Sequence, residues 1–140
     1  MSRHAPESWP TVQLLHELPD GAAHVDWLLG MDPEGRQPLI TFRLPRRVDE
    51  LRAGETMEAQ RIADHRPAYL YYEGPVSGGG GSGGRGTVRR LRRGRIHRFD
   101  PHQPVWILEV VWHGERGPDQ HQRLRLQLRG EHGQIIAESP

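Results

Sequence analysis

A chain of 140 residues is long enough to form one domain that buries about two-thirds of its unfolded surface, so folding requires no metal or disulfide. The absence of cysteine excludes disulfide frameworks, thiolate zinc sites and thiol nucleophiles. The formal net charge is +1, and every basic residue is an arginine or a histidine. No apolar run approaches a membrane span, and the N-terminus has no apolar signal core, so we expect a soluble, cytoplasmic protein.

Residues 1–10 contain two prolines and are predicted to be a flexible lead-in to a single domain over residues 11–140. Strands are expected at 11–17 and 24–29, joined by a turn at Asp20-Gly21, because Asp-Gly is typical of hairpins. A helical turn is expected within 48–54. Further strands are predicted at 39–44, 56–62, 105–112, 122–128 and 134–137.

The glycine-rich stretch at 77–86 is predicted to be a mobile loop, because it has few side chains that would select one conformation. After it, residues 87–92 and 95–99 are expected to form a hairpin around Arg93-Gly94. Seven arginines and no acidic residue lie between Arg85 and Arg98, a pattern that suits nucleic-acid phosphates. A solvated arginine-rich hairpin explains the same charges equally well.

No stretch has a long amphipathic helical period, and short strands alternate with Gly/Pro turns. The sequence therefore predicts an all-β fold, a small closed or partly open barrel of about eight to ten short strands. Trp106 and Trp112 share one face of the most apolar strand and are predicted to lie in the core. Tyr71 and Tyr72 are expected to be aromatics of the barrel wall.

The first predicted hairpin carries a candidate metal site. His24 and Asp26 share one face of the second strand, because strand side chains alternate with period 2. His16, on the first strand, can supply a third ligand across the turn. Two imidazoles and one carboxylate are a common ligand set for Mn or Zn. Plain surface histidines are the alternative interpretation, because His-x-Asp is a short motif.

Several weak motifs follow one another in a specific order. They are His16 with His24-Val25-Asp26, Asp64-His65-Arg66-Pro67-Ala68-Tyr69, Glu73-Gly74, Gly86-Thr87-Val88 and Arg93-Gly94. Over residues 12–98 this ordered set resembles the 3′-phosphoesterase domain of bacterial DNA ligase D and its short stand-alone relatives.

The resemblance implies a small β-barrel that trims 3′-ribonucleosides or 3′-phosphates from primer ends in DNA repair, usually with manganese. It implies that His16, His24 and Asp26 are metal ligands and that His65 and Tyr69 act on the scissile phosphate. It also implies that Arg46 takes the place of a phosphate-binding lysine. Arg61 is a further candidate phosphate contact, because it lies close to His65 in the sequence. The implied partners are nucleic-acid 3′ ends and a DNA ligase or polymerase. No association with a membrane is expected.

The chain departs from the family pattern in ways that bear on activity. Leu28 replaces an arginine, Glu17 replaces an aspartate, and residues 1–10 contain no counterpart of the family's basic N-terminal arm. Losing one charged phosphate contact costs about two to three orders of magnitude in rate. A catalytically weak or inactive nucleic-acid-binding module of a repair complex is therefore the main alternative, and a small-molecule site using the same metal is a third.

Overall fold

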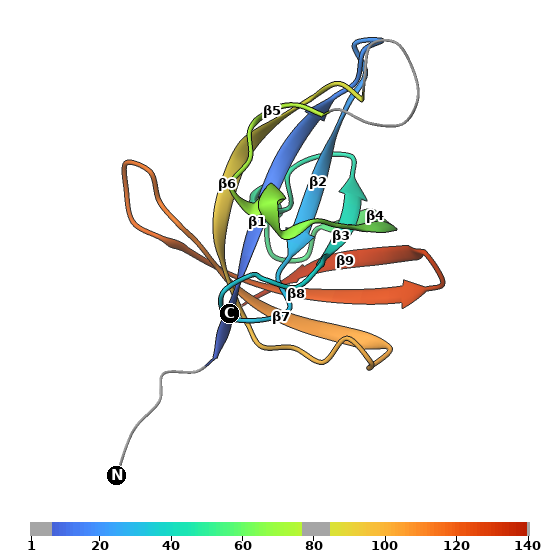
Figure 1. The fold of residues 1–140 in the computed structure, drawn as a ribbon. Coiled ribbons are helices and arrows are strands. Elements are labelled where there is room, and N and C mark those ends of the chain that lie inside the picture. The colour runs from blue at the N-terminus through green and yellow to red at the C-terminus, as the bar shows by residue number, and fades with distance from the viewer. Residues whose placement is uncertain (1–6, 77–84, 140) are drawn as a thin grey trace.

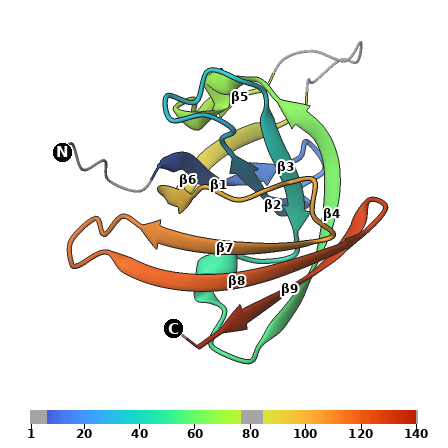
Figure 2. The ribbon, with the colours of Figure 1, turned by 90° about the horizontal axis from the view of Figure 1, so that it is seen from below.

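Eight antiparallel strands close into a barrel in the computed structural model, which describes residues 7–76 and 85–139 (Figures 1 and 2). The strands are β1 (Ser8–Glu17), β2 (Ala23–Leu29), β3 (Leu39–Leu44), β4 (Thr56–His65), β6 (Thr87–His97), β7 (Val105–Trp112), β8 (Gln120–Arg129) and β9 (His132–Glu138). Their order around the barrel is β1-β2-β3-β4-β9-β8-β7-β6, and β6 pairs with β1 to close it. The two-residue strand β5 (Gly74–Pro75) adds to β6. The prediction of an all-β barrel is confirmed.

The strand limits differ from the predicted ones mainly at the ends. β3 and β7 match their predicted ranges. The expected lead-in is shorter than predicted, because β1 begins at Ser8 and its first residues pair with β6. Residues 1–6 of that lead-in, and residues 77–84 of the predicted glycine-rich loop, lie outside the described part of the chain. No helix within the described ranges has the length and apolar character needed to cross a membrane.

The predicted hairpin around Arg93-Gly94 is wrong, because residues 87–97 form the single strand β6. Gly94 is not a turn residue: it pairs with Trp112, and a Cβ there would overlap the carbonyl oxygen of Val111. Glycine at this position lets β7 approach closely. An irregularity in the β1–β6 register at Leu91 then reverses which side chains of β6 face inward.

That reversal divides the arginine-rich stretch between different environments. Arg92 donates to Asp49, Arg95 donates to the hydroxyl and carbonyl oxygens of Ser8, and Arg98 pairs with Glu7. Arg92 and Arg95 therefore attach β6 to Asp49 and to β1, whereas Arg98 makes an exposed ion pair. The expected single basic hairpin does not exist in the structure.

The barrel interior is filled by a single large apolar core, rich in aromatic rings. Phe42 lies edge-to-face with Trp106 at a ring-centroid distance of 5.7 Å and tilted against Trp27 at 6.2 Å. Trp112 is fully buried in the same cluster. The predicted core positions of Trp106 and Trp112 are confirmed, and the packed rings leave the interior to side chains rather than to a ligand.

A buried polar network attaches the short 3-10 helix η1 (Val48–Glu50), the helical turn expected in this region, to the surrounding strands. Asp49 is only 4% exposed and accepts hydrogen bonds from Gln13 at 2.7 Å and from Arg47 at 2.7 and 3.0 Å. Arg92 completes the set at 3.2 Å. Burial acts to raise the pKa of Asp49, but the hydrogen bonds from Arg47 and Gln13 outweigh it and hold the pKa below its ordinary value.

A second, smaller apolar cluster lies on the outer face of β1, β2, β3 and β6. Its buried members are Val12, Leu14, Leu28, Leu39, Leu70 and Val88. Alternation places these strand residues opposite the interior core, so a second layer must cover them. The segment from the 3-10 helix η2 (Pro67–Leu70) through β5 to Val76 provides that layer, with Leu70, Tyr69 and Val76 packed on the cluster.

The covering segment also carries the two tyrosines that were expected in the barrel wall. Tyr71 is 66% exposed and Tyr72 is 39% exposed, so that prediction is wrong. Both follow η2, outside the strands, and the periodicity of a strand does not apply to them.

Candidate metal centre

The β1–β2 hairpin brings His16, His24 and Asp26 to one point on the outer face of the barrel. His16 lies directly opposite His24 in the strand register, and Leu14 lies opposite Asp26. Gly21 has a φ of +89°, which the tight connection requires and which glycine adopts without strain. Since Asp26 alternates with the interior residues Val25 and Trp27, it must face outward, beneath the covering segment.

The distances within this cluster match those of ligands that share one ion. His16 Nδ1 is 3.2 Å from His24 Nε2, His24 Nε2 is 3.0 Å from Asp26 Oδ1, and His16 Nδ1 is 3.5 Å from Asp26 Oδ2. Ligands bound to a divalent ion at about 2.0–2.2 Å lie about 3.0–3.5 Å apart. Among the described residues, this is the only group of three or more His, Cys, Asp or Glu side chains with metal-binding spacing.

Backbone carbonyls orient two of the nearby imidazoles. His16 Nε2 lies 2.5 Å from the carbonyl oxygen of Arg85, and His65 Nδ1 lies 3.2 Å from that of Ala63. A carbonyl oxygen only accepts, so each of these nitrogens carries the proton when the ring is neutral. The remaining nitrogens, His16 Nδ1 and His65 Nε2, then direct their lone pairs toward Asp26, at 3.5 and 3.7 Å.

The cluster is therefore a convergence of acceptors around a buried carboxylate. Asp26 is 1% exposed, and its Oδ1 accepts no hydrogen bond from any described residue. Burial, the largest effect, lowers the pKa of His24 below its ordinary value, and the nearby Arg43 and His16 act in the same direction against the attraction of Asp26. A neutral His24 has a lone pair to offer. Among the described residues, His24 Nε2, at 3.2 Å from His16 Nδ1 and 3.0 Å from Asp26 Oδ1, supplies at most one proton to these acceptors. A divalent cation fits these side chains, because it would take the place of that single shared proton.

A β-bulge brings His65 to the same side of the sheet. Along β4, Ile62 lies opposite Thr41 on the outer face, so regular alternation would direct Asp64 outward and His65 inward. The register shifts between Thr41 and Leu39, and His65 lies opposite Leu39 instead. The extra residue of the bulge thus reorients the imidazole toward Asp26.

Tyr69 accompanies His65 at the rim of the site. Their rings meet edge-to-face with centroids 5.4 Å apart, and the Arg66 guanidinium lies 5.9 Å from the Tyr69 ring. The five residues proposed as ligands and catalytic groups, His16, His24, Asp26, His65 and Tyr69, are therefore adjacent in space.

The two cations expected to bind phosphate are not brought into this cluster. Arg46 is exposed in the loop after β3 and borders neither of the two hollows beside this cluster. Arg61 faces the opposite side of β4, where it lies 6.0 Å from the Trp106 ring and 3.8 Å from Asp64. The arginine absent at Leu28 has a physical explanation, because Leu28 is fully buried under the covering segment.

Arg43 is the cation that the sequence reasoning missed. It lies opposite Asp26 in the β2–β3 register, on the outer face, and makes no ion pair with any described residue. The alternation of Leu39, Thr41 and Arg43 placed it on one face of β3. The pairing of β3 with β2 is what brings that face of β3 next to the metal cluster.

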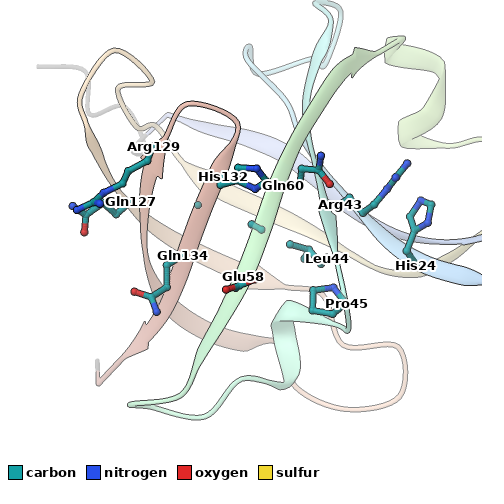
Figure 3. Close-up of a pocket in the computed structure, with 12 residues that line it drawn as sticks. His24, Arg43, Leu44, Pro45, Glu58, Gln60, Gln127, Arg129, His132 and Gln134 are labelled. Atoms are coloured by element: carbon teal, nitrogen blue, oxygen red, sulfur yellow. The ribbon is translucent and has the colours of Figure 1, made fainter.

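Two hollows meet at Arg43. One, of about 770 Å³, is bordered by His16, Asp26, Arg43, His65 and Tyr69. The other, of about 710 Å³, extends from His24 and Arg43 across β4 and β9 to β8 (Figure 3). The buried carboxylate and three imidazoles therefore border one or the other of two hollows, and the Arg43 guanidinium borders both.

The fold and this cluster define a closed β-barrel protein with a candidate metal centre on its outer face. A scan against models of known protein families found no match, and a search of curated proteins also found none.

Proposed function

We propose that this protein is a metal-dependent phosphoesterase that trims 3′-ribonucleoside or 3′-phosphate ends of DNA or RNA primers in DNA repair. The observation that carries the proposal is the convergence of His16, His24 and Asp26 on one point, with His65 and Arg43 facing the same hollow. The resemblance of the ordered motifs to the 3′-phosphoesterase domain of DNA ligase D supports it. A DNA ligase or polymerase that uses the trimmed end is the expected partner, and the cytoplasm is the expected location.

Manganese is the favoured ion, with zinc or another transition metal as an alternative, because two imidazoles and a carboxylate suit each of them. A divalent ion held by His16, His24 and Asp26 would supply Lewis-acid chemistry, polarising a phosphoryl oxygen and acidifying a water molecule. Asp26 contributes the one negative charge of the ligand set. The Arg85 carbonyl keeps His16 in the tautomer that presents Nδ1.

The remaining side chains have roles that their positions suggest. His65, fixed through Nδ1 by the Ala63 carbonyl, presents Nε2 for proton transfer or for a hydrogen bond to a phosphate oxygen. Tyr69, beside it, orients the phosphate through its hydroxyl group. Arg43 neutralises charge on the phosphoryl oxygens, the role for which Arg46 was predicted and in which the family uses additional cations.

The nucleic-acid-binding module remains the second candidate, and one observation favours it. Arg89 and Arg93 of β6 are exposed and make no ion pair with any described residue, so both are available for backbone phosphates. On this alternative the protein binds DNA in a salt-dependent manner without trimming it.

Arg43→Ala is expected to lower the rate of manganese-dependent trimming about 100-fold, because a charged contact to the transition state is lost. Arg46→Ala, the matched control, should stay within about twofold of the wild type, since Arg46 borders neither hollow. The measurement is single-turnover cleavage of a primer strand ending in a 3′-phosphate or 3′-ribonucleotide.

His24→Ala sets the baseline for this assay. Wild-type trimming no faster than that of His24→Ala, together with salt-dependent DNA binding, would exclude the enzyme and favour the binding module. Equal losses in Arg43→Ala and Arg46→Ala would contradict the role given to Arg43.

A further inference from the structure

A continuous row of polar side chains leads away from the metal cluster across the outer face of the barrel. In the strand registers Asp26 lies opposite Arg43, Arg43 opposite Gln60, Gln60 opposite His132, and His132 opposite Arg129. Paired residues of neighbouring strands point to the same face, so the row crosses β2, β3, β4, β9 and β8 without interruption. Figure 3 shows Arg43, Gln60 and His132 in succession along it.

The row borders the hollow of about 710 Å³ that begins beside His24. Ala59 and Gly133, which pair with each other between the two rows of longer side chains, also border it. We name this hollow the β4–β9 groove. It is lined by His24, Arg43, Leu44, Pro45, Glu58, Ala59, Gln60, Gln127, Arg129, His132, Gly133 and Gln134.

The charged side chains of the groove lie in two parallel rows that cross the strands. Within the groove, the row described above begins at Arg43 and ends at Arg129, and neither arginine makes an ion pair with a described residue. The neighbouring row is formed by Gln127, Gln134 and Glu58, paired in that order. The first row therefore suits a polyanion, and the second ends in a carboxylate that repels one.

We propose that the β4–β9 groove binds the single-stranded nucleic acid that leads to the 3′ end at the metal cluster. The inference rests on the proposed function, because it names the path of the substrate of that same site. Arg43 and Arg129 contact backbone phosphates, and the amides of Gln60 and the ring of His132 hydrogen-bond to sugars or bases between them.

The dimensions and the charges both favour one strand. The four steps from β2 to β8 span about 19 Å at about 4.8 Å per step, the length of about five or six stacked nucleotides at about 3.4 Å each. A duplex would place a second backbone beside the first row. There the Glu58 carboxylate would oppose it.

The test measures binding and trimming of 3′-phosphorylated oligodeoxynucleotides of increasing length, from two to ten nucleotides. Wild-type affinity should rise up to about six nucleotides and then level off. Arg129→Ala should lose about tenfold in affinity for the six-nucleotide strand and lower its salt dependence, because one phosphate contact is removed. Trimming of the dinucleotide should be unchanged, since Arg129 lies far from the cluster.

Two further variants separate the groove from general effects. Glu58→Gln should bind the six-nucleotide strand more tightly than the wild type, an increase that damaged folding does not produce. Arg116→Ala removes an exposed arginine in the loop between β7 and β8, outside the groove, and should behave as the wild type.

Each outcome distinguishes this inference from the proposed function. Trimming without any length dependence, or an equal loss in Arg129→Ala at every length, would overturn the groove and leave the phosphoesterase intact. Length-dependent binding that Arg129→Ala weakens, without trimming of any oligonucleotide, would support the groove and overturn the enzyme.

Discussion

Asp26→Asn is expected to abolish metal-dependent activity while leaving the metal-free protein at least as stable as the wild type. The carboxylate is 1% exposed and faces imidazole nitrogens that direct lone pairs toward it. Without a cation, this buried charge is poorly compensated, and an amide of the same shape relieves it. Affinity for Mn²⁺ should fall at least about 100-fold, and trimming by about three orders of magnitude.

Thermal unfolding in EDTA and in Mn²⁺ measures both effects. The wild type should gain stability when Mn²⁺ is added, because a ligand that binds only the folded state stabilises it, and Asp26→Asn should gain none. Asp64→Asn is the matched control, since Asp64 borders the same hollow but is largely exposed and lies outside the cluster. An equal Mn²⁺-induced shift in Asp26→Asn would show that the ion does not bind at this cluster.

Asp49→Ala should lower the free energy of unfolding by about 3 kcal/mol and decrease the Tm by about 10 °C. The substitution leaves the fully buried amide of Gln13 without its acceptor and removes one of the three acceptors of the Arg92 guanidinium, which keeps Gln120 and the His113 carbonyl. Arg47 is 31% exposed and is partly solvated, which limits the loss. Glu50→Ala, the exposed neighbour in the same 3-10 helix, should change stability by less than about 0.5 kcal/mol.

The same carboxylate makes stability depend on pH, with a definite sign. The folded-state pKa of Asp49 lies below its ordinary value, so the unfolded chain binds the proton more readily. Its stabilising contribution is complete above about pH 4 and is lost as the pH falls through the lower folded pKa. Denaturant unfolding from pH 7 to pH 2.5 should therefore show a smaller difference between wild type and Asp49→Asn at the acid end. A constant difference would mean that Asp49 is not preferentially ionised in the folded state.

Placing the candidate site outside the barrel explains how one small domain holds both a stable core and an open polar surface. The interior is occupied by the rings of Trp27, Phe42 and Trp106, and the outer face of β2 and β3 is free to carry Asp26 and Arg43. Only part of that outer face is apolar, and the segment from η2 to Val76 covers it.

Features that depend on nearby residues were predictable from the sequence alone. The Asp-Gly turn and the period-2 alternation on either side of it are local, and together they indicated that His16, His24 and Asp26 share one face of a hairpin. The strands at 39–44 and 105–112 and the all-β class were predictable for the same reason. Turn chemistry and side-chain alternation act over a few residues, and a sequence displays them directly.

Only the tertiary structure decided which face is inward and which distant residues meet on it. The bulge that directs His65 toward Asp26, the register that selects Arg43 over Arg46 and Arg61, and the irregularity at Leu91 that splits the arginine run all arise between strands far apart in the chain. A shift of one residue in pairing moves every side chain of a strand to the other face. No local pattern encodes that shift, because it is set by packing against the aromatic core and by closure of the barrel.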